Sequence, residues 1–122
     1  MRAIGVVTSV GTEDQAYLIA RELIARRQAA CVNVLSGVRS IYRWKGKICK
    51  DDEFLLVIKT RAEEFEAVAA TIRELHSYEL PEILAFNVSK GDKSFLAWIG
   101  ASVDKNADFD DDEEDEDEQA YE

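Results

Sequence analysis

The sequence is poor in the residues from which catalytic and metal sites are most often built. Its 122 residues include one histidine and two cysteines. A structural zinc site needs about four Cys or His ligands, and a Ser-His-Asp or Cys-His device needs a histidine beside an exposed nucleophile. The nucleophile-elbow, phosphate-loop and dinucleotide-binding glycine motifs are also absent from the sequence. The composition therefore argues against an enzyme and against a metal site made by one chain alone.

Long apolar runs are missing as well. No stretch reaches the roughly 18 apolar residues of a membrane span. No basic segment is followed by an apolar run and a small-residue cleavage site, so no signal peptide is visible. We therefore expect no membrane partner and a cytoplasmic location.

Negative charge is plentiful but unevenly placed. The chain has 25 acidic and 15 basic residues, and residues 104–122 hold 12 of the acids and one of the bases. Residues 1–103 are left with a net charge of +1, which argues against a nucleic-acid partner. We expect residues 1–103 to form one domain and residues 104–122 to form a disordered acidic tail.

The first half of the chain reads as strand, helix, strand. Residues 3–9 are β-branched and uncharged, which predicts a buried strand. Thr12 and Gln15 have the spacing of a capping box, and apolar residues at helical spacing follow them. Strand patterns then cover residues 29–35 and 38–44, and the Ser-Gly pair between them predicts a bulge or bend.

A long β-hairpin is expected around the two-residue turn at 45–46. In the simplest register Cys49 lies opposite Tyr42, and Cys31 lies opposite Thr60. The two cysteines are then too far apart along the ladder for an intrachain disulfide.

The second half repeats the pattern. Thr60 and Glu63 have the spacing of a second capping box, and an apolar stripe over residues 65–75 predicts the second helix. Residues 83–88 form a strand pattern, and residues 92–101 a short amphipathic helix. Two strand-helix-strand halves joined by a hairpin describe a ferredoxin-like α+β sandwich, βαββαβ, with a long hairpin and a short C-terminal helix.

Such a sandwich leaves one sheet face and an edge strand without cover, which favours oligomerisation. Tyr42 and Trp44 share one face near the hairpin tip, where a single domain cannot easily bury them. Because Trp and Tyr are enriched at interfaces, we expect both residues at a subunit interface. Trp98, on the last helix, is expected to cover the open sheet at that interface.

His76 is the only imidazole, and its simplest interpretation is a histidine at a helix end stabilised by the helix dipole. In a symmetric trimer each ligand occurs three times, so His76, Glu79, Glu82 and Cys49 become candidate ligands of shared metal sites. Thr60 also ends a strand where amides can hold an anion, although an N-cap role explains it more simply.

Five segments in this order resemble the CutA family of divalent-cation tolerance proteins, over residues 3–103. They are Ala29-Ala30-Cys31-Val32-Asn33, Ser40-x-Tyr42-x-Trp44-x-Gly46, Lys59-Thr60, His76-x-Tyr78-Glu79-x-Pro81-Glu82 and Leu96-x-Trp98-Ile99. The resemblance implies a ferredoxin-like homotrimer, mostly cytoplasmic, from a family with no established enzymatic reaction. It also implies a role in tolerance of copper and other divalent metals.

The copper ligands of some bacterial members carry over only in part. Val7 stands where those members have a cysteine, and Leu75-His76 stands where they have two histidines. We therefore expect no required cofactor and weak binding of Cu²⁺ or another divalent cation, through His76 and Glu79. The alternative is a module resembling P-II signalling proteins that binds a small anion or nucleotide between subunits.

Overall fold

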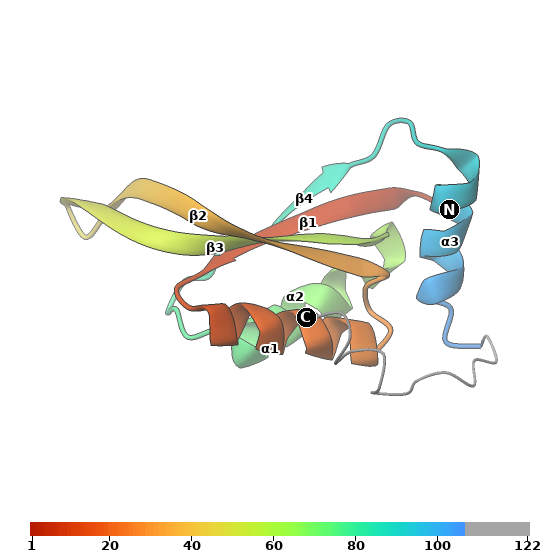
Figure 1. Cartoon of the computed structure of the whole chain (residues 1–122), viewed down its shortest axis with the longest axis horizontal. Helices are drawn as coiled ribbons and strands as arrows, with labels where there is room; N and C mark the ends of the chain where they lie inside the picture. The colour runs from red at the N-terminus through yellow and green to blue at the C-terminus, as the bar shows by residue number, and fades with distance from the viewer. Residues whose placement is uncertain (107–122) are drawn as a thin grey trace.

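The computed structural model describes residues 1–106, which form one four-stranded antiparallel sheet and three α-helices. The predicted α+β ferredoxin-like order is confirmed, and the strands lie in the order β2-β3-β1-β4 (Figure 1). Along the chain the elements are β1 (Ala3–Val10), α1 (Glu13–Ala25), β2 (Cys31–Trp44), β3 (Lys47–Arg61), α2 (Phe65–Leu75), β4 (Leu84–Asn87) and α3 (Lys93–Ser102). No helix within residues 1–106 is long and apolar enough to cross a membrane.

Helices α1 and α2 lie together on one side of the sheet (Figure 1). Alternate residues of β1 and β3 face them, so the core forms between the two layers. Its fully buried side chains are those of Val6, Val10, Ile19, Leu23, Leu56, Ile58, Val68 and Ile72. The periodicity of 2 in the strands and 3.6 in the helices places all of these residues on the inner faces.

Among residues 1–106, no helix covers the opposite face of the sheet (Figure 1). The strand register places six apolar side chains there, which we call the open-face patch: Val7, Leu35, Leu55, Val57, Leu84 and Phe86. Phe86 is 58% exposed and Leu84 is 53% exposed. An apolar surface of this kind on a sheet marks an interaction site.

The long hairpin is confirmed, with one correction to its register. Lys45 and Gly46 both have positive φ, 51° and 79°, as the turn that matches strand twist requires. Tyr42 lies opposite Cys49 as predicted. Cys31 lies opposite Lys59, not Thr60, because a β-bulge between Leu35 and Val38 adds one residue to β2. The Ser-Gly pair predicted this bulge, and its extra residue shifts the pairing of residues 31–35 by one position.

The two predicted capping boxes are also corrected. The Gln15 backbone N–H donates to Thr12 Oγ1 at 3.2 Å, but the Gln15 side chain turns away and donates to the Leu75 carbonyl oxygen at 2.8 Å. Thr60 caps no helix, because it belongs to β3 and its hydroxyl donates to the Gln28 carbonyl oxygen at 2.7 Å. A short 3-10 turn, Ala62–Glu64, starts the second helix without a side-chain cap.

Helix α3 stands at the end of the sheet where β1 begins (Figure 1), and it contacts β1 and β3. Its N-cap is Asp92, which accepts from the Phe95 N–H at 3.0 Å. Trp98 is 46% exposed, and its ring packs against Phe95 with 5.3 Å between centroids. The interface role expected for Trp98 stays a prediction. From residue 107 onward, the expected acidic tail lies outside the described residues.

Candidate functional site

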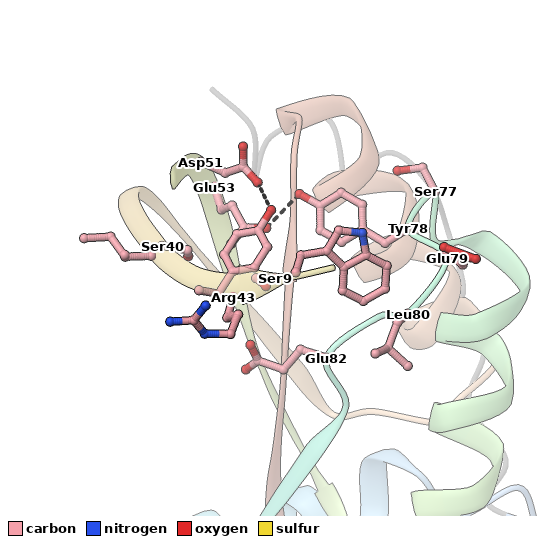
Figure 2. Close-up of a pocket in the computed structure, with 13 residues that line it drawn as sticks. Ser9, Ser40, Arg43, Asp51, Glu53, Ser77, Tyr78, Glu79, Leu80 and Glu82 are labelled. Carbon is pink, nitrogen blue, oxygen red and sulfur yellow. Dashed lines mark hydrogen bonds between the residues drawn. The ribbon is translucent and has the colours of Figure 1, made fainter. Parts of the chain in front are cut away.

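A cavity of about 770 Å³ lies beside the β2–β3 hairpin. The hairpin extends past the end of β1 (Figure 1). The hairpin forms one wall, and the segment between α2 and β4, residues 77–82, forms the other. This volume lies within the range of small-molecule sites, roughly 300–1,000 Å³. Figure 2 shows the side chains that line it.

Three aromatic side chains line the cavity: Tyr42 and Trp44 from β2, and Tyr78 from the segment after α2. Tyr42 is 42% exposed and Trp44 is 37% exposed, so both rings remain accessible. Tyr42 and Trp44 share a face because residues two apart on a strand point the same way. The interface role expected for these two residues stays a prediction, and the structure adds that both line this cavity.

Four carboxylates line the same cavity: Asp51 and Glu53 from β3, and Glu79 and Glu82 from the facing segment. Arg43 is the one basic residue among the lining side chains. Glu53 is 6% exposed, whereas the other three acids are exposed. The lining therefore has a formal excess of negative charge, which is unfavourable for an anion or a nucleotide.

Two of these carboxylates accept hydrogen bonds from tyrosine hydroxyls. Tyr42 donates to Asp51, and Tyr78 donates to Glu53 at 2.7 Å (Figure 2). The bond to Asp51 raises the pKa of Tyr42 to about 12. Burial, then the bond to Glu53, raises the pKa of Tyr78 well above its usual range. Both phenols therefore remain protonated donors across the physiological pH range.

His76, the predicted metal ligand, lies beside this cavity and not among its lining residues. Its Nε2 donates to the Ser9 carbonyl oxygen at 2.7 Å, while Nδ1 accepts from the Tyr78 N–H at 3.1 Å. The ring also contacts that of Tyr78, with 4.7 Å between centroids. A metal ion at either nitrogen must displace one of these hydrogen bonds.

The other predicted metal ligand, Glu79, is exposed at the cavity wall. Within residues 1–106, no three His, Cys, Asp or Glu side chains lie close enough together to hold a metal ion. The described residues of a single chain therefore contain no preformed site for copper. Copper ligation by His76 and Glu79 stays a prediction.

Sequence reasoning singled out Glu79 and Glu82, as candidate metal ligands, but not the other two carboxylates of the cavity, Asp51 and Glu53. Asp51 and Glu53 follow Cys49 at every second position, so the confirmed register around Tyr42 contained the signal that they share its face. The contact between Glu53 and Tyr78 had no such signal. Tyr78 lies in an irregular segment without periodicity, and the two residues are 25 positions apart.

Curated relatives match over most of this chain. The "Divalent-cation tolerance protein CutA" of Thermus thermophilus is 39% identical over 94 residues, which are 77% of this chain and 91% of the relative. The "Protein CutA homolog" of Xenopus laevis is 44% identical over 85 residues, 70% of this chain and 56% of the relative. The chain spans about half the length of the animal and plant relatives that it matches. None of these relatives is named as an enzyme.

The expected cytoplasmic location is contradicted by the names of relatives. A protein of Arabidopsis thaliana, 33% identical over 101 residues, is named "Protein CutA, chloroplastic". A solved structure from Archaeoglobus fulgidus, 35% identical with a TM-score of 0.81, is described as a periplasmic divalent cation tolerance protein. The prediction was based on the lack of a recognisable targeting signal. That lack does not determine the compartment, because relatives with this fold are named as chloroplastic and periplasmic.

The fold and the sequence agree on the family. The crystal structure of CutA from Xylella fastidiosa superposes with a TM-score of 0.82 at 38% identity, covering 84% of this chain and 98% of that one. The model of the family described as "CutA1 divalent ion tolerance protein" matches residues 4–102. This match confirms the resemblance seen in the five sequence segments. The chain belongs to the CutA1 divalent ion tolerance family.

Proposed function

We propose that this chain is a non-enzymatic homotrimer that takes part in tolerance of divalent cations and binds Cu²⁺ weakly. The observation that carries the proposal is the family match over residues 4–102, the whole α+β body. Relatives over the same body are named for divalent-cation tolerance. The scarcity of nucleophile and base pairs in the sequence supports a binding role over a catalytic one.

The open-face patch supports the assembly. Apolar side chains such as Phe86 and Leu84 are more than half exposed in the single chain, and burying them against another copy is favourable. Trp44 lies near the tip of the β2–β3 hairpin. This hairpin, which we call the hairpin arm, extends beyond the rest of the sheet and can reach a neighbouring subunit (Figure 1). Closed cyclic symmetry covers such a surface in every subunit at once.

His76 is the residue that supports weak copper binding. Imidazole suits copper better than a carboxylate does, and this is the chain's only imidazole. Both of its ring nitrogens already make hydrogen bonds, to Ser9 and Tyr78, and these compete with the metal.

Calorimetry with Cu²⁺ on the full chain tests the metal proposal. His76→Gln keeps a polar side chain without the imidazole and should weaken binding by about tenfold or more. Asp52→Asn is the matched control on an exposed hairpin acid and should leave binding unchanged. Because all variants carry the same acidic C-terminal residues, nonspecific uptake cancels in the comparison. Equal Cu²⁺ binding by wild type and His76→Gln would remove this residue from the site.

Sedimentation equilibrium tests the assembly. The chain has a mass of 13.7 kDa, and the proposal requires three times that mass at micromolar concentration. A monomer under these conditions contradicts the trimer.

A further inference from the structure

We propose that the cavity between the hairpin arm and residues 77–82 binds a small organic cation, an alkyl diamine or related ammonium. This inference goes beyond the proposed tolerance of metal ions, and although Glu79 is common to both proposals, it does not depend on His76. The cavity combines three features that a cationic organic ligand needs: negative charge, accessible aromatic rings and room for a hydrocarbon chain.

The negative charge of the lining residues favours a positively charged ligand. Asp51, Glu53, Glu79 and Glu82 line the cavity against the single guanidinium of Arg43. Carboxylates are acceptors only, so they offer no donor to a phosphate or a carboxylate ligand. An ammonium group, which has only donors, complements them.

The spread of these acids selects an organic cation over a bare metal ion. A bare divalent ion such as Ca²⁺ needs about six or more oxygen ligands close together. Within the described chain, no three acidic, His or Cys side chains converge in that way. Asp51 and Glu53 each already accept a tyrosine hydroxyl, which fixes them in place and leaves other lone pairs free. A larger cation needs only a few such acceptors at separated positions.

The aromatic rings supply the second attraction. Ammonium groups are attracted to the faces of Trp and Tyr rings within about 6 Å of the centroid. The chain already shows this for Trp44, because the Lys45 ammonium nitrogen lies 5.7 Å from its ring centroid. Lys45 is not among the residues that line the cavity. Tyr42 and Tyr78 hold their hydroxyls on carboxylates, which orients both rings at the cavity wall.

The arrangement of the acids favours two cationic groups on one ligand. Figure 2 shows Asp51 and Glu53 on one side of the cavity and Glu79 on the other, with Tyr78 between them. An alkyl diamine can place one ammonium near each side and its apolar chain against the rings. The 770 Å³ volume accommodates a molecule of this size.

The probe is 1,4-diaminobutane, titrated into the full chain carrying Trp98→Phe. This substitution leaves Trp44 as the only tryptophan, so its fluorescence reports on the cavity. We expect a saturable change with a Kd of about 1 mM or tighter at roughly 0.15 M salt. The uncharged analogue 1,4-butanediol has the same length and should produce no change.

Variants locate the site by calorimetry. Glu79→Gln with Glu82→Gln should weaken diamine binding by about threefold to tenfold, and Trp44→Leu by about threefold. Asp52→Asn removes one charge from the same hairpin but does not line the cavity, so it should change binding by less than about twofold. All variants keep the same acidic C-terminal residues.

Four results overturn the proposal. They are the absence of saturable binding, an equal response to the diol, an Asp52→Asn effect as large as that of the double variant, and displacement of the diamine by an equal concentration of Mg²⁺. The third result would assign the binding to general charge, and the fourth to a metal site. The Cu²⁺ test depends on His76, which does not line the cavity, so the two proposals fail separately.

Discussion

Tyr78 donates its hydroxyl hydrogen to Glu53 at 2.7 Å, and this bond ties the segment after α2 to the base of the hairpin arm (Figure 2). Glu53 is a carboxylate with 6% exposure, so it depends on this partner for the hydrogen bonding that water no longer supplies. Both residues also line the cavity. Stability and the candidate site therefore share one hydrogen bond.

Replacing Tyr78 with Phe should lower the free energy of unfolding by about 1–3 kcal/mol, because it leaves a buried carboxylate without its donor. Urea denaturation measures the loss. Glu53→Gln should cost less, since an amide oxygen still accepts the hydroxyl. The double variant should cost less than the sum of the two single variants, which is the sign of a direct interaction. A Tyr78→Phe protein as stable as wild type would show that the bond contributes nothing.

The raised pKa of Tyr42 predicts that the protein loses stability at high pH. Its hydrogen bond to Asp51 raises the pKa of Tyr42 from an ordinary value of about 10 to about 12. A raised pKa means that the folded state holds the proton more tightly, so this stabilisation is complete below pH ~10 and is lost as the pH approaches ~12. Absorbance titration of tyrosinate should show late titration of both Tyr42 and Tyr78, and Tyr42→Phe should remove one of these two groups.

Asp51→Asn is the control for that titration. It keeps an acceptor near Tyr42 but removes the negative charge, so the pKa of Tyr42 should fall back toward its ordinary value. If the titration curve is the same in Asp51→Asn and wild type, the carboxylate does not cause the shift.

Local patterns in the sequence predicted the elements, because strands and helices have fixed periods and the Lys45-Gly46 turn has its own backbone requirement. Contacts between distant segments were not predictable in this way. Thr60 has the spacing of an N-cap, yet a carbonyl oxygen 32 residues earlier, that of Gln28, takes its hydroxyl. Gln15 similarly serves a carbonyl 60 residues later.

In the candidate site, too, local positions were predictable and contacts between distant segments were not. Alternation along β2 placed Tyr42 and Trp44 together on the arm, and this needed only the strand period. Glu53 and Tyr78 meet only after the chain has folded, so neither local composition nor spacing marked them as a pair. The sequence therefore predicted the aromatic pair on the hairpin and marked Glu79 and Glu82 as candidate ligands, but it did not predict that the two segments face each other.

Assembly through the open-face patch predicts the effect of Phe86→Asp. Phe86 is 58% exposed on β4, so a charge there should leave the single chain folded while it opposes burial against another copy. We expect the mass in sedimentation equilibrium to fall toward that of one chain, with an unchanged circular dichroism spectrum. A hot-spot position in such an interface is worth about 2 kcal/mol or more per site.

Leu18→Asp is the matched control for that experiment. Leu18 is 46% exposed on α1, on the opposite side of the sheet from the open-face patch (Figure 1). The same substitution there should leave the oligomer intact. Dissociation by Leu18→Asp and not by Phe86→Asp would place the interface on the helical side.

Lys105, near the C-terminal end of the described residues, makes two contacts with the folded domain. The Lys105 ammonium donates to Glu64 Oε1 at 2.9 Å and to the Arg27 carbonyl oxygen at 3.0 Å. Glu64 is a nearly buried acid, with a side chain 12% exposed, and its other ion pair, to Arg61, is long at 4.0 Å. Lys105 is therefore its closer cationic partner, although it lies beyond residue 103, where the sequence placed the end of the domain.

Truncation after Asn106 removes 11 of the 12 acidic residues of positions 104–122 but keeps this contact, so the melting temperature should stay within about 1 °C of the full chain. Truncation after Val103 also removes Lys105 and should lower it by about 3–6 °C, which corresponds to about 1 kcal/mol for a half-exposed ion pair. Lys105→Met in the full chain should reproduce the second result, because it removes the charge and keeps every acidic residue. Equal melting temperatures for the two truncated chains would mean that Lys105 adds no stability and that the domain ends at Val103.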